Sequence, residues 1–217
     1  MLRILITAGA TREMLDPVRF LSNLSTGKMG YALAEMARKR GHRVVLISAP
    51  TDLKPPSKVK FVSVVNTLQM QSAVKRYFGD VDSLIMTAAV SDYRPQRIAK
   101  QKIKKTKTLV LKLRQNPDIL FELGKKKADK ILVGFSLESR KWLENSREKL
   151  LKKNLDFIVA NRISKTKNPF GENRISGAIL DGDGGVEKFS NTEKEKIAEK
   201  VIRKVEKIWS TMEGYSP

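Results

Sequence analysis

The chain has 217 residues, of which 43 are Lys or Arg and 23 are Asp or Glu, so its formal net charge is +20. This length fits one medium domain, and 41% hydrophobic residues are enough for a core. The absence of cysteine excludes disulfides and thiolate metal sites, while the single histidine, His42, excludes a histidine cluster for zinc and disfavours a histidine-based triad.

The excess of positive charge is compatible with nucleic acid, a membrane surface or small polyanionic ligands. Aromatic residues make up only 6% of the chain, too few for the stacking platforms of single-strand binding, so we do not expect nucleic acid as a partner. No apolar run approaches the length of a membrane span, and no small-residue cleavage site of a signal peptide follows the N-terminal run. We therefore expect a cytoplasmic protein without a membrane partner.

Apolar runs alternate with helix-like patterns from the N-terminus onward. Residues 2–7 are apolar and β-branched and end in small residues, which is typical of a buried parallel strand. The same alternation predicts strands at 42–48, 59–64, 82–89, 131–139 and 155–161. It predicts helices at 27–40, 67–78, 141–154 and 192–209. Another helix is expected to start at the Asn-Pro-Asp of 116–118. Near the C-terminus, residues 176–181 and 186–190 flank DGDGG and predict a hairpin.

The segment 93–115 interrupts this rhythm. It is polar and rich in lysine, and it then alternates in TLVLKLRQ (108–115), which predicts a strand or ribbon rather than a crossover helix. The expected fold is therefore α/β, a doubly wound and mostly parallel sheet with an inserted ribbon or loop near 93–115 and a C-terminal hairpin and helix. Because no separable linker is evident, residues 1–217 are expected to form a single domain.

Ligands of doubly wound sheets bind outside the carboxyl ends of the strands. Two strands end in small residues, TAGAT after the first and TAAVSD after the fourth, so these loops are candidate ligand sites. Close packing of helices on the sheet is an alternative reason for such small residues. A nicotinamide oxidoreductase on the same fold is disfavoured, because GxGxxG is missing and no acidic residue ends the second strand.

The entrance of the first helix is crowded with small hydrogen-bonding residues in SNLSTGK. An ordinary N-cap needs one such side chain, whereas an anion site would use free N–H groups, the helix dipole and the charge of Lys28. The residues alone leave both interpretations open. They are Asn23, Ser25, Thr26, Gly27 and Lys28.

Two groups of lysines accompany these loops. Lys102 begins KIKK in the inserted segment, where it could reach a triphosphate or a carboxylate, or belong to a mobile, solvated loop. Lys149 and Lys153 share one helical stripe, while Lys152 points away from it. Two explanations fit that stripe equally well. The two lysines could bind an anion between them, or their aliphatic stems could cover core residues while the charged ends reach solvent.

No nucleophile–base pair is evident, and GxxxxGK[ST] does not occur. A site of amides, hydroxyls and lysines suits phosphoryl or nucleotidyl chemistry, in which positioning and charge stabilisation supply most of the catalysis.

Six motifs follow one another in this chain: TAGATREMLDPVRFLSNLSTGKMGYALA, TAAVSDYRP, KIKK, NPDIL, VGFSLE and KNLDFIVAN. In this order they resemble the phosphopantothenate–cysteine ligase (phosphopantothenoylcysteine synthetase) family in its bacterial, CTP-dependent form. The resemblance implies a Rossmann-like fold, a homodimer, a divalent ion that is usually Mg²⁺, and a role in coenzyme A biosynthesis. It implies that 4′-phosphopantothenate reacts with CTP to an acyl-cytidylate and pyrophosphate, and that cysteine then forms the amide 4′-phosphopantothenoylcysteine and releases CMP.

The resemblance also implies roles for individual residues, of which Asn23 and Lys102 are expected to be catalytic. Expected at the nucleotide are Met86, Thr87, Ala88, Asp92, Lys102, Pro117, Asp118, Ile119, Leu120, Phe135, Lys149 and Lys153. Expected at phosphopantothenate are Asn23, Ser25, Thr26, Gly27, Lys28 and Ala89. The sequence indicates no metal ligands and does not decide between CTP and ATP.

The chain departs from the family pattern in its first loop, which reads TAGAT where many members have SxGGT. Ala8 and Ala10 therefore replace residues at a close backbone approach, where alanine tolerates positive φ less well than glycine. Many bacterial members also carry an N-terminal flavin-dependent decarboxylase domain, so this chain is expected to be a stand-alone ligase or a domain of such a fusion.

Overall fold

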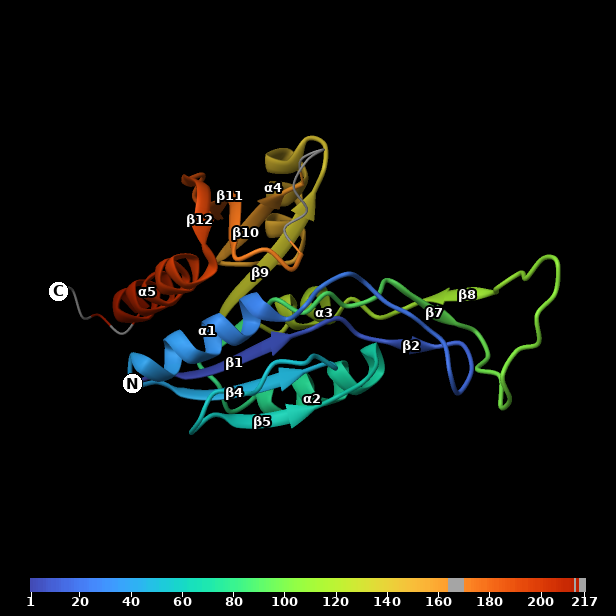
Figure 1. The fold of residues 1–217 in the computed structure, drawn as a ribbon. Coiled ribbons are helices and arrows are strands. Elements are labelled where there is room, and N and C mark those ends of the chain that lie inside the picture. The colour runs from blue at the N-terminus through green and yellow to red at the C-terminus, as the bar shows by residue number, and fades with distance from the viewer. Residues whose placement is uncertain (164–169, 213, 215–217) are drawn as a thin grey trace.

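The computed structural model describes residues 1–163, 170–212 and 214. Its centre is an eight-stranded sheet in the order β12-β11-β10-β9-β6-β1-β4-β5 (Figure 1). The strands from β10 to β5 are parallel neighbours, and β11 and β12 extend the sheet as an antiparallel hairpin. The strands are β1 (Arg3–Ala8), β4 (Arg43–Ser48), β5 (Lys60–Ser63), β6 (Ser83–Met86), β9 (Ile131–Glu138), β10 (Phe157–Arg162), β11 (Arg174–Asp181) and β12 (Val186–Glu193).

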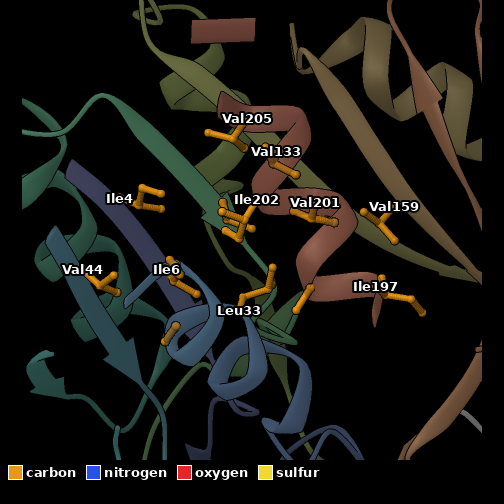
Figure 2. Close-up of a cluster of buried hydrophobic side chains, with 14 of the residues drawn as sticks. Ile4, Ile6, Leu33, Val44, Val133, Val159, Ile197, Val201, Ile202 and Val205 are labelled. Atoms are coloured by element: carbon orange, nitrogen blue, oxygen red, sulfur yellow. The ribbon is translucent and has the colours of Figure 1, made fainter. Parts of the chain in front are cut away.

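Helices cover both faces of the sheet. On one face α1 (Lys28–Lys39) and α5 (Lys194–Met212) pack against the sheet and each other, and Figure 2 shows Leu33 of α1 and Val201 of α5 in their shared core. On the other face lie α2 (Thr67–Phe78), α3 (Ile119–Gly124) and α4 (Trp142–Lys152). Successive side chains of a strand point to opposite faces, so Ile4 and Ile6 join the first core and Leu5 the second. The α/β class predicted from the sequence is confirmed.

The inserted segment differs in detail from its prediction. Of the predicted strand 108–115, only β8 (Leu113–Gln115) is a strand, and it pairs with β7 (Tyr93–Pro95) as a short antiparallel ribbon. A strand needs a paired backbone, and of the earlier residues in this run only Lys112 has a backbone partner among the described residues, because its carbonyl accepts from the N–H of Gln96 at 2.9 Å. Two strands that the sequence did not predict, β2 (Glu13–Met14) and β3 (Phe20–Leu21), form a hairpin beside the ribbon.

We call residues 93–115, together with the hairpin of β2 and β3, the arm. Figure 1 shows β7, β8 and their connecting loop extending well beyond the end of the central sheet. The backbone N–H of Ala99 donates to the carbonyl of Leu15 at 2.9 Å, which ties the loop to the hairpin. The arm therefore projects as one unit from the carboxyl edge of the sheet.

Small residues at this edge allow two close approaches. Gly9 has φ +82°, and a Cβ there would lie 2.8 Å from the carbonyl oxygen of Ala49. Neither Ala8 nor Ala10 has positive φ, so their departure from the family pattern leaves this loop unstrained. A Cβ on Gly30 would lie 2.6 Å from Cβ of Ala8, so this glycine lets α1 rest on the end of β1. Packing thus explains some of the small residues in these loops.

No helix in the described ranges is both long and apolar enough to cross a membrane.

Candidate active site

A cavity of about 480 Å³ opens at the carboxyl edge of the sheet, where the loops after β3 and β6 meet the N-terminus of α1 and the C-terminus of α4. It gathers segments that lie far apart in the sequence. The predicted site residues in its wall are Asn23, Ser25, Thr26, Gly27, Lys28, Met86, Thr87, Ala88, Ala89, Asp92, Pro117, Asp118, Ile119, Leu120, Phe135, Lys149 and Lys153.

Lys102 is the one predicted site residue that the cavity wall of the described chain does not include. It is exposed and lies in the loop between β7 and β8. Figure 1 shows that this loop points away from the sheet. The structure therefore separates Lys102 from the other predicted residues within one chain.

The entrance of α1 lacks the side-chain cap that one interpretation of SNLSTGK required. Its N-cap is Gly27, with φ +79°, and among the described residues no side chain accepts a hydrogen bond as its cap. Ser25 Oγ instead accepts from the N–H of Gly27 at 3.4 Å, and Thr51 Oγ1 donates to the carbonyl of Thr26 at 3.0 Å. The first-turn N–H groups and the positive end of the helix dipole therefore lie at the cavity wall, as in an anion site.

Asn23 lies at the junction of two loops. Its Nδ2 donates to the carbonyl of Ala89 at 3.2 Å, and the same carbonyl accepts from the N–H of Thr11 at 3.2 Å. The side chain is exposed, so its amide is accessible from the cavity. An amide N–H of this kind can stabilise charge that develops on a substrate oxygen.

A buried polar network joins the loops that line the cavity. Thr11 Oγ1 accepts from the N–H of Ser91 at 3.0 Å, and it lies 3.2 Å from Oγ1 of Thr67, the first residue of α2. Asn116 Nδ2 donates to the carbonyl of Ser91 at 2.8 Å and to Thr67 Oγ1 at 3.1 Å. Satisfied buried networks rigidify the segments that they connect, so these loops are held as one wall.

Both lysines of the predicted helical stripe line the cavity, and each faces a carboxylate. Lys149 Nζ lies 2.5 Å from Oε1 of Glu138, and Lys153 Nζ lies 2.8 Å from Oδ2 of Asp118. Both pairs are partly exposed and worth little in stability, so an incoming phosphate can compete for the two ammonium groups. The structure thus brings Lys149 and Lys153 to the cavity, as an anion between them would require.

Several polar residues of the wall were missed by the sequence interpretation. Asn116 directly precedes the predicted Pro117, so its place in the motif was an available signal. Ser136 and Asn161 come from core strands, and Lys194 starts the C-terminal helix, where a lysine is typical of a solvated face. Among the described residues no group of three or more His, Cys, Asp or Glu could hold a metal ion.

Comparisons with known proteins agree with the motifs. Residues 1–208 match the family model described as DNA/pantothenate metabolism flavoprotein C-terminal domain. The coenzyme A biosynthesis bifunctional protein CoaBC of Bacillus subtilis (strain 168) is 45% identical over 183 residues, which are 83% of this chain and 45% of that protein. The chain thus spans less than half the length of this curated relative.

Solved structures share the fold. The crystal structure of the C-terminal domain of a coenzyme A biosynthesis bifunctional protein CoaBC superposes with a TM-score of 0.83 at 38% identity, covering 96% of both chains. A mutant of Cab2 in complex with phosphopantothenate-cysteine superposes with a TM-score of 0.79 over 97% of this chain and 88% of that one. At 19% identity, this second likeness concerns the fold alone.

Proposed function

The chain belongs to the family of DNA/pantothenate metabolism flavoprotein C-terminal domains, and from this membership we propose that it acts as a phosphopantothenate–cysteine ligase. The observation that carries the proposal is the single cavity whose wall includes every predicted site residue except Lys102. The 45% identity to a bifunctional CoaBC supports a role in coenzyme A biosynthesis. We propose further that residues 1–217 fold as one domain, since one sheet runs through nearly the whole chain.

The proposed reaction has two steps. A carboxylate oxygen of 4′-phosphopantothenate attacks the α-phosphorus of CTP, and the bond to the β-phosphate breaks, which gives an acyl-cytidylate and releases pyrophosphate. The amine of cysteine then attacks the acyl carbon, the bond to CMP breaks, and the amine loses a proton as the amide forms. Neither step needs a covalent enzyme intermediate, which suits a wall of amides, hydroxyls and lysines.

Different residues of the cavity wall would serve the two steps of the reaction. Met86 ends β6 and Thr87 and Ala88 follow it, and these residues would face the nucleotide through their backbone. Lys149 and Lys153 would leave their carboxylate partners to bind the phosphates of the nucleotide. Asn23 would donate its amide N–H to the acyl oxygen as cysteine attacks.

A divalent ion fits this wall. Mg²⁺ is usually held by one or two carboxylates together with substrate phosphates, and Asp92 and Asp118 place carboxylates at the cavity. When bound, the ion would neutralise charge on the triphosphate. Asp118 would then exchange its contact with Lys153 for a contact with the ion.

We propose that a homodimer brings Lys102 to the reaction. The arm carries Lys102 away from the cavity of its own chain, and it exposes large apolar side chains such as Ile98 (60% exposed) and Val110 (82% exposed). Exposed apolar patches mark interaction surfaces. In a symmetric dimer held by the arms, Lys102 of one subunit would reach the cavity of the other and stabilise the phosphate charge of the first step.

A pyrophosphate-release assay tests the proposal. We expect release from CTP only when 4′-phosphopantothenate is present, and amide product only after cysteine is added. Comparing CTP with ATP in the same assay measures the nucleotide preference. Absence of pyrophosphate with both nucleotides would exclude the ligase function.

A further inference from the structure

Two threonines exchange hydrogen bonds where β1 and β6 end. Thr7 is the penultimate residue of β1 and is completely buried, and Thr87 directly follows β6. Thr87 Oγ1 donates to the carbonyl of Thr7 at 2.6 Å, and Thr7 Oγ1 accepts from the N–H of Ala88 at 3.1 Å. Thr87 and Ala88 line the cavity, whereas Thr7 is outside its wall in the part of the chain that the structure describes. A buried hydroxyl therefore holds the cavity wall from behind.

Packing alone does not explain the hydroxyl of Thr7. Its neighbours in β1, Ile6 and Ala8, are buried and apolar. Valine has nearly the same shape as threonine and suits a buried strand equally well, without the cost of burying a hydroxyl group. The hydroxyl meets one local need, because Met86 is the last residue of β6 in the ladder with β1 and the N–H of Ala88 lies beyond that ladder. Its second effect is on the direction of a carbonyl at the cavity.

The bond to Thr7 fixes the peptide group between Thr87 and Ala88. A trans peptide group is planar, so its N–H and C=O point in opposite directions, and the described chain contains no cis peptide bond. β6 lies between β1 and β9, and the N–H of Ala88 points to Thr7 in β1. The carbonyl of Thr87 therefore points toward the β9 side, where Phe135 and Ser136 line the same cavity.

The loop after β6 presents acceptors to the cavity rather than donors, because the N–H groups of residues 88–91 all donate within the protein. Their acceptors are, in order, Thr7 Oγ1 at 3.1 Å, the carbonyl of Gly9 at 2.9 Å, the carbonyl of Ala88 at 3.1 Å and Thr11 Oγ1 at 3.0 Å. A carbonyl oxygen has two lone pairs and can accept from a ligand, whereas each of these N–H groups already has its acceptor. A ligand group that binds this loop must therefore supply an N–H or an O–H.

Only part of a nucleotide has such donors. Its phosphate oxygens are acceptors, and they are expected at Lys149 and Lys153 of the same cavity. The nucleoside part of CTP has two kinds of donor, the 4-amino group of cytosine and the hydroxyls of ribose. The carbonyl of Thr87 thus suits the nucleoside and not the triphosphate.

We propose that Thr7 is a positioning residue for the nucleotide. Its hydroxyl turns the carbonyl of Thr87 into the cavity, where this carbonyl accepts a hydrogen bond from the nucleoside part of CTP. This inference rests on the proposed ligase function and adds to it a residue behind the cavity wall. Thr7 acts through the peptide group between Thr87 and Ala88, so its hydroxyl should matter for the nucleotide and not for phosphopantothenate.

The test removes the hydroxyl of Thr7 at nearly constant shape. Release of pyrophosphate by the wild-type chain from CTP and phosphopantothenate first establishes the ligase function. Thr7→Val should then raise the KM for CTP by about tenfold, the value of one hydrogen bond, and leave kcat and the KM for phosphopantothenate unchanged. Thr7→Ala removes the hydroxyl without relying on the fit of valine and should show the same loss.

Two further variants separate positioning from packing. Thr7→Ser keeps the hydroxyl and loses the methyl group, so its KM for CTP should stay close to the wild-type value. A packing role would instead make Thr7→Ser worse than Thr7→Val. Thr192→Val is the matched control, because Thr192 lies in the edge strand β12 and its hydroxyl donates to the carbonyl of Ser190 at 3.1 Å. This control should change neither KM.

Nucleotide analogues show which donor the carbonyl of Thr87 binds. One analogue is the 5′-triphosphate of 2-pyrimidinone riboside, which is CTP without its 4-amino group, and the others are 2′-deoxy-CTP and 3′-deoxy-CTP. The analogue that lacks the bound donor should raise the KM by about tenfold in the wild-type chain and by much less in Thr7→Val, because the variant has already lost that bond. Such a loss with the first analogue assigns the contact to the base, and with a deoxy analogue it assigns the contact to the ribose.

Three results would overturn the inference while leaving the ligase function intact. One is an unchanged KM for CTP in both Thr7→Val and Thr7→Ala. Another is an equal rise of the KM for phosphopantothenate, which would show a general distortion of the cavity. The third is a set of analogue losses that are the same in the wild-type chain and in Thr7→Val.

Discussion

The carboxylate of Asp16 binds the backbone of Ile103, the residue that follows Lys102 in the arm. Asp16 Oδ2 accepts the N–H of Ile103 at 3.1 Å, and Arg19 Nη2, itself paired with Asp16, donates to the carbonyl of Ile103 at 2.6 Å. Asp16 is completely buried. A carboxylate and a guanidinium thus hold both backbone groups of one residue, which fixes where KIKK begins.

Asp16→Asn tests whether this contact positions Lys102. The amide keeps the size of the side chain but loses the charge that pairs with Arg19, so the start of KIKK should become mobile. We expect pyrophosphate release to slow by about tenfold, the value of a weakened charged hydrogen bond, with an unchanged KM for phosphopantothenate. Asp129→Asn, at an exposed carboxylate, serves as the control. An unchanged rate in Asp16→Asn would show that Lys102 needs no such anchor.

The same contact predicts a pH dependence of stability. Burial raises the pKa of the Asp16 carboxyl, but hydrogen bonds from Arg19, Ile103 and Val18 outweigh burial and hold that pKa well below its usual value. The folded chain therefore binds fewer protons at Asp16 than the unfolded chain, and the contribution of Asp16 is full above the unfolded pKa of about 4 and falls as the pH drops below it.

Thermal unfolding from pH 8 to pH 3 measures this effect. The difference in Tm between wild type and Asp16→Asn should stay constant above about pH 4 and narrow at lower pH. A difference in Tm that already narrows between pH 8 and pH 5 would show that an ionisable group other than Asp16 causes the pH dependence.

Asn23→Asp should separate the two steps of the reaction. A carboxylate cannot donate to the acyl oxygen, so attack by cysteine should slow by about a hundredfold or more, the cost of one lost oxyanion donor. Activation by CTP does not use that donor, so the acyl-cytidylate should accumulate. Mass spectrometry of quenched reactions detects this intermediate, and a variant that forms the amide at the normal rate would exclude the role of Asn23.

Mixing two inactive variants tests whether Lys102 acts across subunits. Lys102→Gln should stop activation, and Asn23→Asp should slow amide formation by the factor given above. In a mixed dimer, the cavity of the first chain keeps Asn23 and receives Lys102 from the second chain. Coexpression in equal amounts should then restore amide formation to about a quarter of the wild-type rate, since half of the dimers are mixed and one of their two sites is complete.

The control for this mixture is a double variant. Chains with both substitutions, Lys102→Gln and Asn23→Asp, should restore nothing when mixed with either single variant. No recovery in the original mixture, despite mixed dimers on native mass spectrometry, would place Lys102 in the cavity of its own chain.

Lys149 and Lys153 should act on the nucleotide alone. Replacing either by Met should raise the KM for CTP by about tenfold, the value of one charged contact, and leave the KM for cysteine unchanged. Lys152→Met is the matched control, because Lys152 is exposed on the same helix and is not in the cavity wall. Equal effects at all three positions would indicate a general loss of positive charge.

Much of the fold could be predicted because its signals are local. The predicted strand 2–7 and the predicted helix 67–78 correspond to β1 and α2, since apolar periodicity and caps such as Asn66 act within a few residues. The ribbon was predicted too long, because the length of a strand depends on its partner. The capping interpretation of SNLSTGK was wrong, because Gly27 takes the N-cap position.

The sequence by itself determined the order of the strands and helices of the central sheet and the motifs of the family, because both depend on residues that are neighbours along the chain. Only the tertiary structure decided that Lys194 of α5 lies beside Lys28 of α1, and that the arm carries Lys102 away from the cavity. Buried cores and paired strands set the positions of segments that are remote in sequence relative to one another. No short pattern of residues encodes those positions.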